Sequence, residues 1–250
     1  MLEVTILKVE HAGITEARKL LPYIKASHIF SPEAAALSEQ EATQEENYWD
    51  DVLANPEMNR TRLRKTLLKE AYLNLEQYEF DCALVDYLFT EREPKYVAER
   101  FSKQESNHLN TLDNQHLQRM VASEQSIDNI PLFLKTTYDL FCLNEQIRIL
   151  RDCHIATNLD HAEDYIRKRW PRLEMVDTLR LGVMIGSGHY IEEYTTIPVH
   201  APELTKPKIH NQLTDAMQSH PTLEHITPLL MEYRDQLIRE LQRKGLRRAK

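Results

Sequence analysis

The sequence is poor in the residues on which several protein classes depend. Three cysteines among 250 residues, odd in number and scattered, exclude a disulfide framework and a CxxC zinc site. Five glycines exclude a collagen-like or linker-rich chain. No run approaches the roughly 20 apolar residues of a membrane helix, and the first residues, MLEVTILKVE, lack the pattern of a signal peptide. We therefore expect a cytoplasmic protein with no membrane partner.

Basic charge is also scarce. The 31 lysines and arginines are outnumbered by 39 acidic residues, which gives a formal net charge of −8. Nucleic-acid binding usually requires a basic surface, so we expect no nucleic-acid partner. A hydrophobic content of 42% is sufficient for a buried core. The oligomeric state is left open, and a homo-oligomer is one option.

The chain has the composition of a helix-rich protein, because Leu, Glu, Lys and Arg are abundant and glycine is rare. An amphipathic helix is predicted over Ile14–Lys25. Strands separated by helices are typical of an α/β fold, so we predict a small, mixed, partly parallel central sheet flanked by helices. The runs predicted to be its strands are Val4–Val9, Ser27–Phe30, Cys82–Val85 and Leu181–Ile185.

No internal repeat and no linker rich in Pro, Gly or Ser divides the chain. The simplest organisation is a single domain over residues 1–250. Within it, residues 34–130 form a large, mainly helical insertion and residues 197–250 a helical C-terminal extension. Further helices are expected from near Pro131 and over Asn144–Arg169, and two more over His210–Lys250, with a break at His220-Pro221.

The strongest local motif is Ile185-Gly186-Ser187-Gly188-His189, directly after the last predicted strand. Open α/β sheets bind ligands beyond the carboxyl ends of their strands. The glycines allow a sharp turn, and a helix is expected to begin at Tyr190. A histidine at such a turn can bind a metal or transfer a proton near neutral pH.

Two other predicted strands are followed by residues of similar chemistry. The first strand leads to His11, and the second leads to Glu33. If the three strands are neighbours, these two residues and His189 gather at one edge of the sheet. Two histidines and a carboxylate suit a divalent metal. Without a metal, the same set supplies a general base and an acid, and the residues alone leave both open.

Taken with the helical segment Asn144–Ala156, these motifs resemble the TraB/PrgY/GumN family, which includes the TIKI metalloproteases and is distantly related to the ChaN and erythromycin-esterase-like proteins. Members have a histidine after the first strand, a glutamate after the second, a helix with an ER…RD…MA signature and a strand that ends in GxGH. The resemblance covers residues 3 to about 196, with Arg151-Asp152 in the helical signature and Gly186 to His189 in the last motif.

The resemblance implies a metal-dependent, peptidase-like hydrolase that acts on a peptide or another small amide or ester substrate. His11, Glu33 and His189 would hold Mn²⁺, Co²⁺ or Zn²⁺. Arg151 and Asp152 would orient these ligands or bind a substrate carboxylate. The amides of Gly186, Ser187 and Gly188 would stabilise the oxyanion.

Two alternatives remain at this stage. One is a metal-free, esterase-like hydrolase in which a histidine is the general base and Glu33 sets its tautomer. The other is a non-catalytic protein that binds a peptide or regulates a partner. Lys8 supports the second alternative, because it stands where the family has a glycine and its ammonium would repel a dication.

Overall fold

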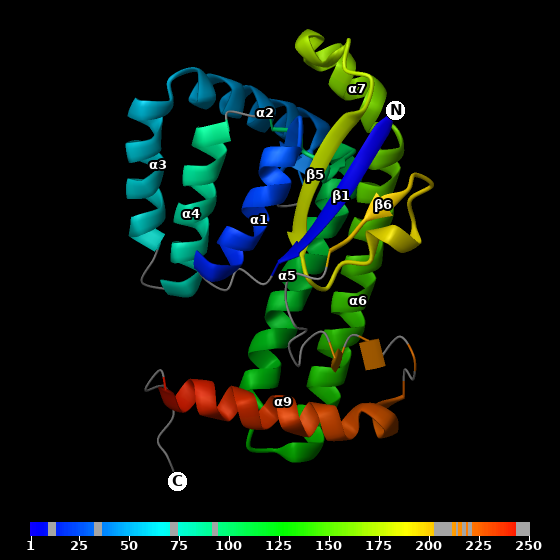
Figure 1. The fold of residues 1–250 in the computed structure, drawn as a ribbon. Helices are drawn as coiled ribbons and strands as arrows, with labels where there is room; N and C mark the ends of the chain where they lie inside the picture. The colour runs from blue at the N-terminus through cyan, green and yellow to red at the C-terminus, as the bar shows by residue number, and fades with distance from the viewer. Residues whose placement is uncertain are drawn as a thin grey trace. The chain divides into compact units, whose positions relative to one another are not determined.

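The structure is a computed structural model that describes residues 1–9, 14–32, 37–70, 75–91, 95–202, 212–213, 215–216, 219 and 222–243. Figure 1 shows the fold. The strands are β1 (Leu2–Val9), β2 (Ile29–Ser31), β3 (Leu37–Ser38), β4 (Arg100–Phe101), β5 (Leu179–Gly186) and β6 (Val199–His200). The helices are α1 (Ile14–Ala26), α2 (Glu39–Ala54), α3 (Pro56–Glu70), α4 (Leu75–Glu91), α5 (Lys103–Gln125), α6 (Ile130–Asp160), α7 (Ala162–Arg169) and α9 (Leu223–Arg243). Two short 3₁₀ turns are η1 (Pro171–Leu173) and η2 (Ile191–Glu193).

The central sheet has the strand order β2-β5-β1-β6, and its described pairings are all parallel. Strands β1 and β5 pair over their whole length, from Leu2 opposite Leu179 to Val9 opposite Gly186. Strand β2 lies on the other side of β5. The helix-rich α/β prediction is therefore confirmed, and the carboxyl ends of β1, β2 and β5 point to the same edge of the sheet.

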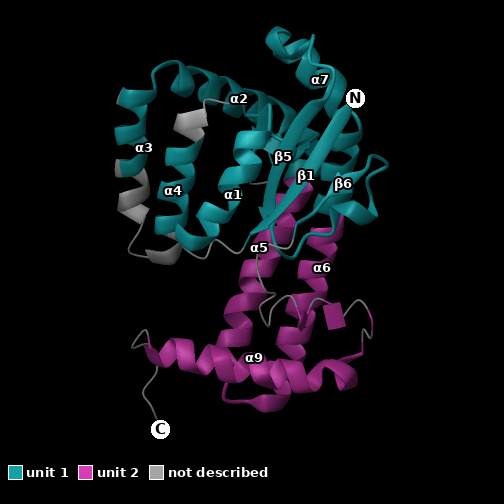
Figure 2. Ribbon diagram, in the orientation of Figure 1, with its two compact units in different colours: residues 1–106, 151–206 teal, residues 107–150, 207–250 magenta. Residues whose placement is uncertain are grey.

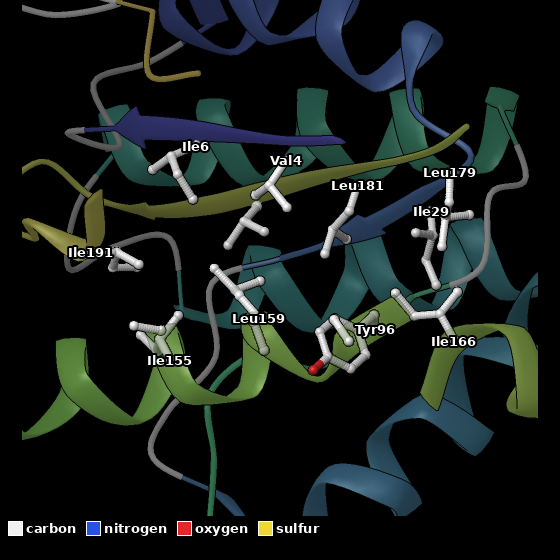
Figure 3. Close-up of a cluster of buried hydrophobic side chains, with 14 of the residues drawn as sticks. Val4, Ile6, Ile29, Tyr96, Ile155, Leu159, Ile166, Leu179, Leu181 and Ile191 are labelled. Carbon is white, nitrogen blue, oxygen red and sulfur yellow. The ribbon is translucent and has the colours of Figure 1, made fainter. Parts of the chain in front are cut away.

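The two faces of this sheet are covered by different helices. On one face, Val4, Ile6 and the alternate residues of β5 pack against Ile155 and Leu159 of α6 and Ile166 of α7 (Figure 3). On the other face, side chains of β1 and β5 pack against α1 and α4. Because successive side chains of a strand point to opposite faces, this sheet is buried on both sides. The sequence shows this most clearly at Ile6-Leu7 of β1 and Val183–Ile185 of β5, where consecutive apolar residues are all buried.

A second, two-stranded sheet pairs β3 with β4 in parallel. Strand β3 leads directly into α2, whose first turn is closed by a capping box. The Ser38 hydroxyl accepts a hydrogen bond from the Glu41 amide, and the Glu41 carboxylate accepts one from the Ser38 amide at 2.9 Å. This cap defines where α2 begins and so where Glu39 lies.

Two sequence-based predictions about secondary structure were wrong, and a third was met only by a short 3₁₀ turn. Cys82–Val85 lies inside α4 and is not a strand. The segment from Pro131 to Asp160 is one helix, α6, and the chain breaks only at His161 before α7. After Tyr190 the chain makes only the short turn η2 before β6. The predicted break at His220-Pro221 lies outside the described residues.

The chain forms two compact units (Figure 2). Unit 1 comprises residues 1–106 and 151–206 and contains both sheets. Unit 2 comprises residues 107–150 and 207–250, and its described core includes Phe141, Leu213, Ile226 and Leu230. Among the described residues, no helix is both long enough and apolar enough to cross a membrane.

Candidate functional site

Of the three predicted metal ligands, only His189 lies among the described residues, because His11 and Glu33 fall outside them. The strand order nevertheless meets one condition of the prediction, since β5 lies between β1 and β2. Strand β2 pairs only as far as Ser31 opposite Val183, three residues before the end of β5. At about 3.3 Å per residue, it therefore ends about 10 Å short of the carboxyl end of β5.

Two backbone hydrogen bonds fix the turn that carries His189. The His189 amide donates a hydrogen bond to the Gly186 carbonyl at 3.2 Å, which closes a β-turn directly after β5. The Ser187 amide donates to the Val9 carbonyl at 2.9 Å and attaches the turn to the end of β1. The Ser187 amide is thus already engaged, and an oxyanion-binding role among the three predicted amides falls to its neighbours. Among the described residues, the Gly188 amide has no hydrogen-bond partner.

His189 is paired with Asp152, which α6 brings to the same edge of the sheet. Nδ1 of His189 is hydrogen-bonded to Oδ1 of Asp152, and the Tyr190 amide donates to Oδ2 at 3.0 Å. Asp152 is completely buried, and His189 is only 9% exposed. A buried carboxylate requires such partners because the loss of its hydration is otherwise costly. The structure thus joins two residues of the sequence motifs that lie 37 positions apart.

The pairing defines what the imidazole can do. An ionised carboxylate only accepts hydrogen bonds, so Nδ1 of His189 is the donor to Asp152, and in the neutral imidazole Nε2 is then the nitrogen with a lone pair. Within the described part of the chain, Nε2 has no hydrogen-bond partner. A histidine oriented by a carboxylate through one nitrogen is the arrangement of many metal ligands and of many general bases.

Arg151, next to Asp152 on α6, is held by a carboxylate that sequence reasoning missed. Its Nε and Nη2 donate to the two oxygens of Glu99, at 2.5 and 2.9 Å. The Glu99 side chain is 6% exposed, so this bidentate pair is largely desolvated. The fork of Arg151 predicted to bind a substrate carboxylate is therefore occupied within the protein. Glu99 directly precedes β4 in the chain, and no local sequence motif distinguishes it.

Lys8 is paired as well. Its ammonium lies 2.5 Å from Glu192 of η2 and 4.8 Å from the centroid of the Tyr190 ring. Glu192 offsets the positive charge that the sequence analysis placed beside the predicted metal. With this partner, Lys8 would repel a dication less strongly than an unpaired lysine would.

A second polar cluster surrounds Glu46 of α2. Glu46 is completely buried, and its carboxylate accepts hydrogen bonds from Arg100, from the Tyr165 hydroxyl at 2.5 Å and from the Val97 amide at 3.0 Å. The Arg100 guanidinium lies over two rings, 4.4 Å from the centroid of Tyr165 and 5.1 Å from that of Tyr96. Burial and the hydrogen bond to Glu46 raise the pKa of Tyr165. Sequence reasoning missed this cluster, because α2 is acidic throughout and nothing marks Glu46 as buried.

A pocket of about 340 Å³ opens beside this second cluster. Three of its lining residues, Tyr96, Arg100 and Tyr165, belong to the cluster. The others come from the first turns of α2, the end of α6 and the residue before α7: Glu39, Thr43, Asn158 and His161. Its volume lies in the range of sites for small molecules.

Comparison with protein-family models, with curated proteins and with solved structures found no match to this chain. The resemblance to the TraB/PrgY/GumN family stays a prediction. Among the residues that the structure describes, no group of three or more His, Cys, Asp or Glu side chains is arranged to hold a metal ion. Two of the three predicted ligands are not among those residues.

Proposed function

We propose that the chain is a peptidase-like hydrolase that acts on a peptide or another amide or ester bond and uses Nε2 of His189 to activate water, either through a bound metal or directly. The supporting observation is the buried Asp152–His189 pair at the carboxyl edge of the central sheet. Parallel α/β sheets carry their sites at this edge. The pair combines an imidazole, the usual proton-transferring group near neutral pH, with a carboxylate that orients it.

In the first form of this proposal, His189 is a ligand of a divalent metal. The donor chemistry fits, because a metal-binding histidine commonly donates its second ring N–H to a carboxylate, as His189 does to Asp152. His11 and Glu33, which in the sequence follow the two strands on either side of β5, complete the set that the sequence predicts. When bound, the metal supplies polarisation of the scissile carbonyl and lowers the pKa of a water molecule.

The residues of the chain have separate tasks in this proposal. Asp152 holds the ring of His189 in one tautomer and orientation. The Gly188 amide is the described donor available for charge on the substrate oxygen. The ion pair between Lys8 and Glu192 limits the positive charge near His189.

The second form needs no metal. It is supported by the Asp152–His189 pair, which already contains an imidazole and the carboxylate that orients it. Nε2 of His189 takes a proton from water, and Asp152 stabilises the imidazolium that results. Asp152 then performs the task that the sequence analysis gave to Glu33 in this form. Both forms require the same imidazole, so they share one decisive variant.

The test is hydrolysis of fluorogenic peptide and ester libraries by the purified chain, together with its metal content measured by mass spectrometry. We expect His189→Ala to lower turnover about 10²–10⁴-fold, the range for loss of a general acid–base group. Asp152→Asn should lower it by a smaller factor, because the imidazole remains. The matched control is His200→Ala, since His200 is an exposed histidine of the same unit.

A chelator distinguishes the two forms. Loss of activity on chelation and recovery with Mn²⁺, Co²⁺ or Zn²⁺ supports the first, and activity that survives chelation supports the second. Equal turnover by His189→Ala and the unaltered chain contradicts both. Saturable peptide binding without any turnover favours the non-catalytic alternative.

A further inference from the structure

We propose that the pocket beside Glu46 binds a small organic cation, a primary ammonium or a guanidinium, independently of hydrolysis at His189. The pocket is separate from the Asp152–His189 pair along α6. Asn158 follows Asp152 by six residues, which is about 9 Å of helix. The inference rests on which polar atoms of the lining are already used within the protein and which are not.

Most hydrogen-bond donors of the lining are already satisfied inside the protein. The hydroxyl of Tyr96 donates to the Asn158 carbonyl at 3.2 Å, and that of Tyr165 donates to Glu46. The hydroxyl of Thr43 donates to the Glu39 carbonyl at 2.8 Å. The side-chain amide of Asn158 donates to two backbone carbonyls, of Ala98 and Arg100, each at 2.9 Å.

Arg100 is not an anion anchor, although it lines the pocket. Its Nη2 is paired with the buried carboxylate of Glu46, and its Nε donates to the Val97 carbonyl at 2.9 Å. Its faces lie over the rings of Tyr96 and Tyr165. Its positive charge is thus offset by a fully buried partner, and a ligand would meet little of it.

The polar groups left for a ligand are acceptors for the most part. Because Asn158 uses its side-chain nitrogen on two carbonyls, its Oδ1 is the atom left over. Among the described residues, this oxygen, the Glu39 carboxylate and the His161 ring have no hydrogen-bond partner. With Arg100 offset by Glu46, Glu39 gives the lining a net negative charge. A cation that carries several N–H donors complements this arrangement.

Two other ligand classes fit less well. A bare divalent ion prefers several carboxylate ligands at about 2.0–2.6 Å, and this lining offers one such carboxylate in a volume of about 340 Å³. An anion would use the amides at the start of α2, but the capping box engages the Glu41 amide there, and the carboxylate of Glu39 in the same turn would repel an anion. The proposed ammonium or guanidinium group can belong to a free amine or to a basic side chain of a peptide.

The experiment is calorimetric titration of the full chain with agmatine, which carries one ammonium and one guanidinium. We expect saturable binding that weakens at least fivefold in Glu39→Gln, the size of one charge-assisted contact, and that also weakens as salt rises. Glu39→Lys should abolish it, because the new ammonium occupies the same position. The controls Glu3→Gln and Glu3→Lys change the charge equally at an exposed position on β1 and should leave binding unchanged.

Further arms identify the source and the limits of this binding. Tighter binding of acetyl-Gly-Arg-Gly-amide than of agmatine would assign the pocket to a peptide side chain, and the reverse would assign it to a free amine. His189→Ala should bind agmatine normally, which separates this inference from the hydrolase proposal. Equal affinity of Glu39→Gln and the unaltered chain overturns the inference. So does binding of inorganic phosphate or Mg²⁺ in place of agmatine.

Discussion

Two carboxylates among the described residues of unit 1 are completely buried, and their surroundings differ in one decisive respect. Glu46 is surrounded by donors of the protein itself: a guanidinium, a hydroxyl and a backbone amide. Asp152 is bound by an amide and by His189, whose second nitrogen has no partner among the described residues. Burial of charge is therefore not enough to indicate a reactive site. What distinguishes Asp152 is that its network leads to an atom that is still able to react.

The comparison predicts that removing Glu46 has the largest effect on stability. Glu46→Ala leaves the partly buried Arg100 without its counterion, and breaking such a pair typically costs about 3–5 kcal/mol. We expect the free energy of unfolding, measured by urea denaturation, to fall by about this amount. Turnover per folded molecule should be unchanged, since Glu46 belongs to the other cluster. A loss below about 1 kcal/mol would show that the pair contributes no more than an exposed one.

Asp152→Asn should have the reverse effect of Glu46→Ala, with a small loss of stability and a large loss of turnover. An asparagine can still accept the Tyr190 amide, so we expect a smaller loss of stability, about 1–3 kcal/mol for one disturbed buried bond. Turnover should fall by a much larger relative factor, because the amide group orients the imidazole less well. Urea denaturation and hydrolysis measured on the same preparation test the comparison directly. Equal losses in stability and activity per folded molecule would assign Asp152 a structural role like that of Glu46.

The loss of stability at alkaline pH tests the role of Tyr96, which belongs to the Glu46 cluster. Burial raises the pKa of Tyr96, so the folded chain keeps its proton at pH values where the unfolded chain has lost it. Stability is then fully present below about pH 10, the pKa of an unfolded tyrosine. Above about pH 10, the free energy of unfolding declines by up to about 1.4 kcal/mol per pH unit.

The matched variant is Tyr96→Phe, which has no proton to lose. It should lose about 1 kcal/mol at neutral pH, because its bond to the Asn158 carbonyl is gone. Its unfolding free energy should fall less steeply above pH 10. Parallel alkaline slopes for the two chains would contradict the role given to Tyr96.

The smallest expected effect is that of the α2 cap. Ser38→Ala removes the side chain that accepts from the Glu41 amide, which should cost about 1 kcal/mol of stability. Because Glu39 is the first residue of α2, fraying of this turn should also weaken agmatine binding slightly. Thermal unfolding and titration together measure both changes. Unaltered agmatine affinity would mean that Glu39 holds its position without the cap.

Part of the fold could be predicted from the sequence because some elements carry their own signal. Strands β1 and β5 are short apolar runs bounded by polar residues, and α1 has a clear amphipathic pattern. Cys82–Val85 has the same local appearance as β5, yet it is one apolar stretch of α4. A short apolar run does not distinguish a buried strand from a buried helix segment.

For the candidate site, the sequence supplied the residue types but not all of their partners. His189 and Asp152 stood in recognisable motifs, and their hydrogen bond depends on the packing of α6 against the sheet. No sequence pattern marked Glu99 and Glu46, because residue type alone does not show whether a glutamate is buried or exposed. Their partners, Arg151 and Arg100, lie 52 and 54 residues away in the chain.

The pairing of β1 with β5 also has a consequence for the order in which the central sheet assembles. Leu2 pairs with Leu179, 177 residues later. At about 5–20 residues per second, a ribosome needs about 10–35 seconds to supply the second strand of this pair. Strand β1 therefore leaves the ribosome before its neighbour has been made, and the edge that carries His189 forms only after β5 has been synthesised.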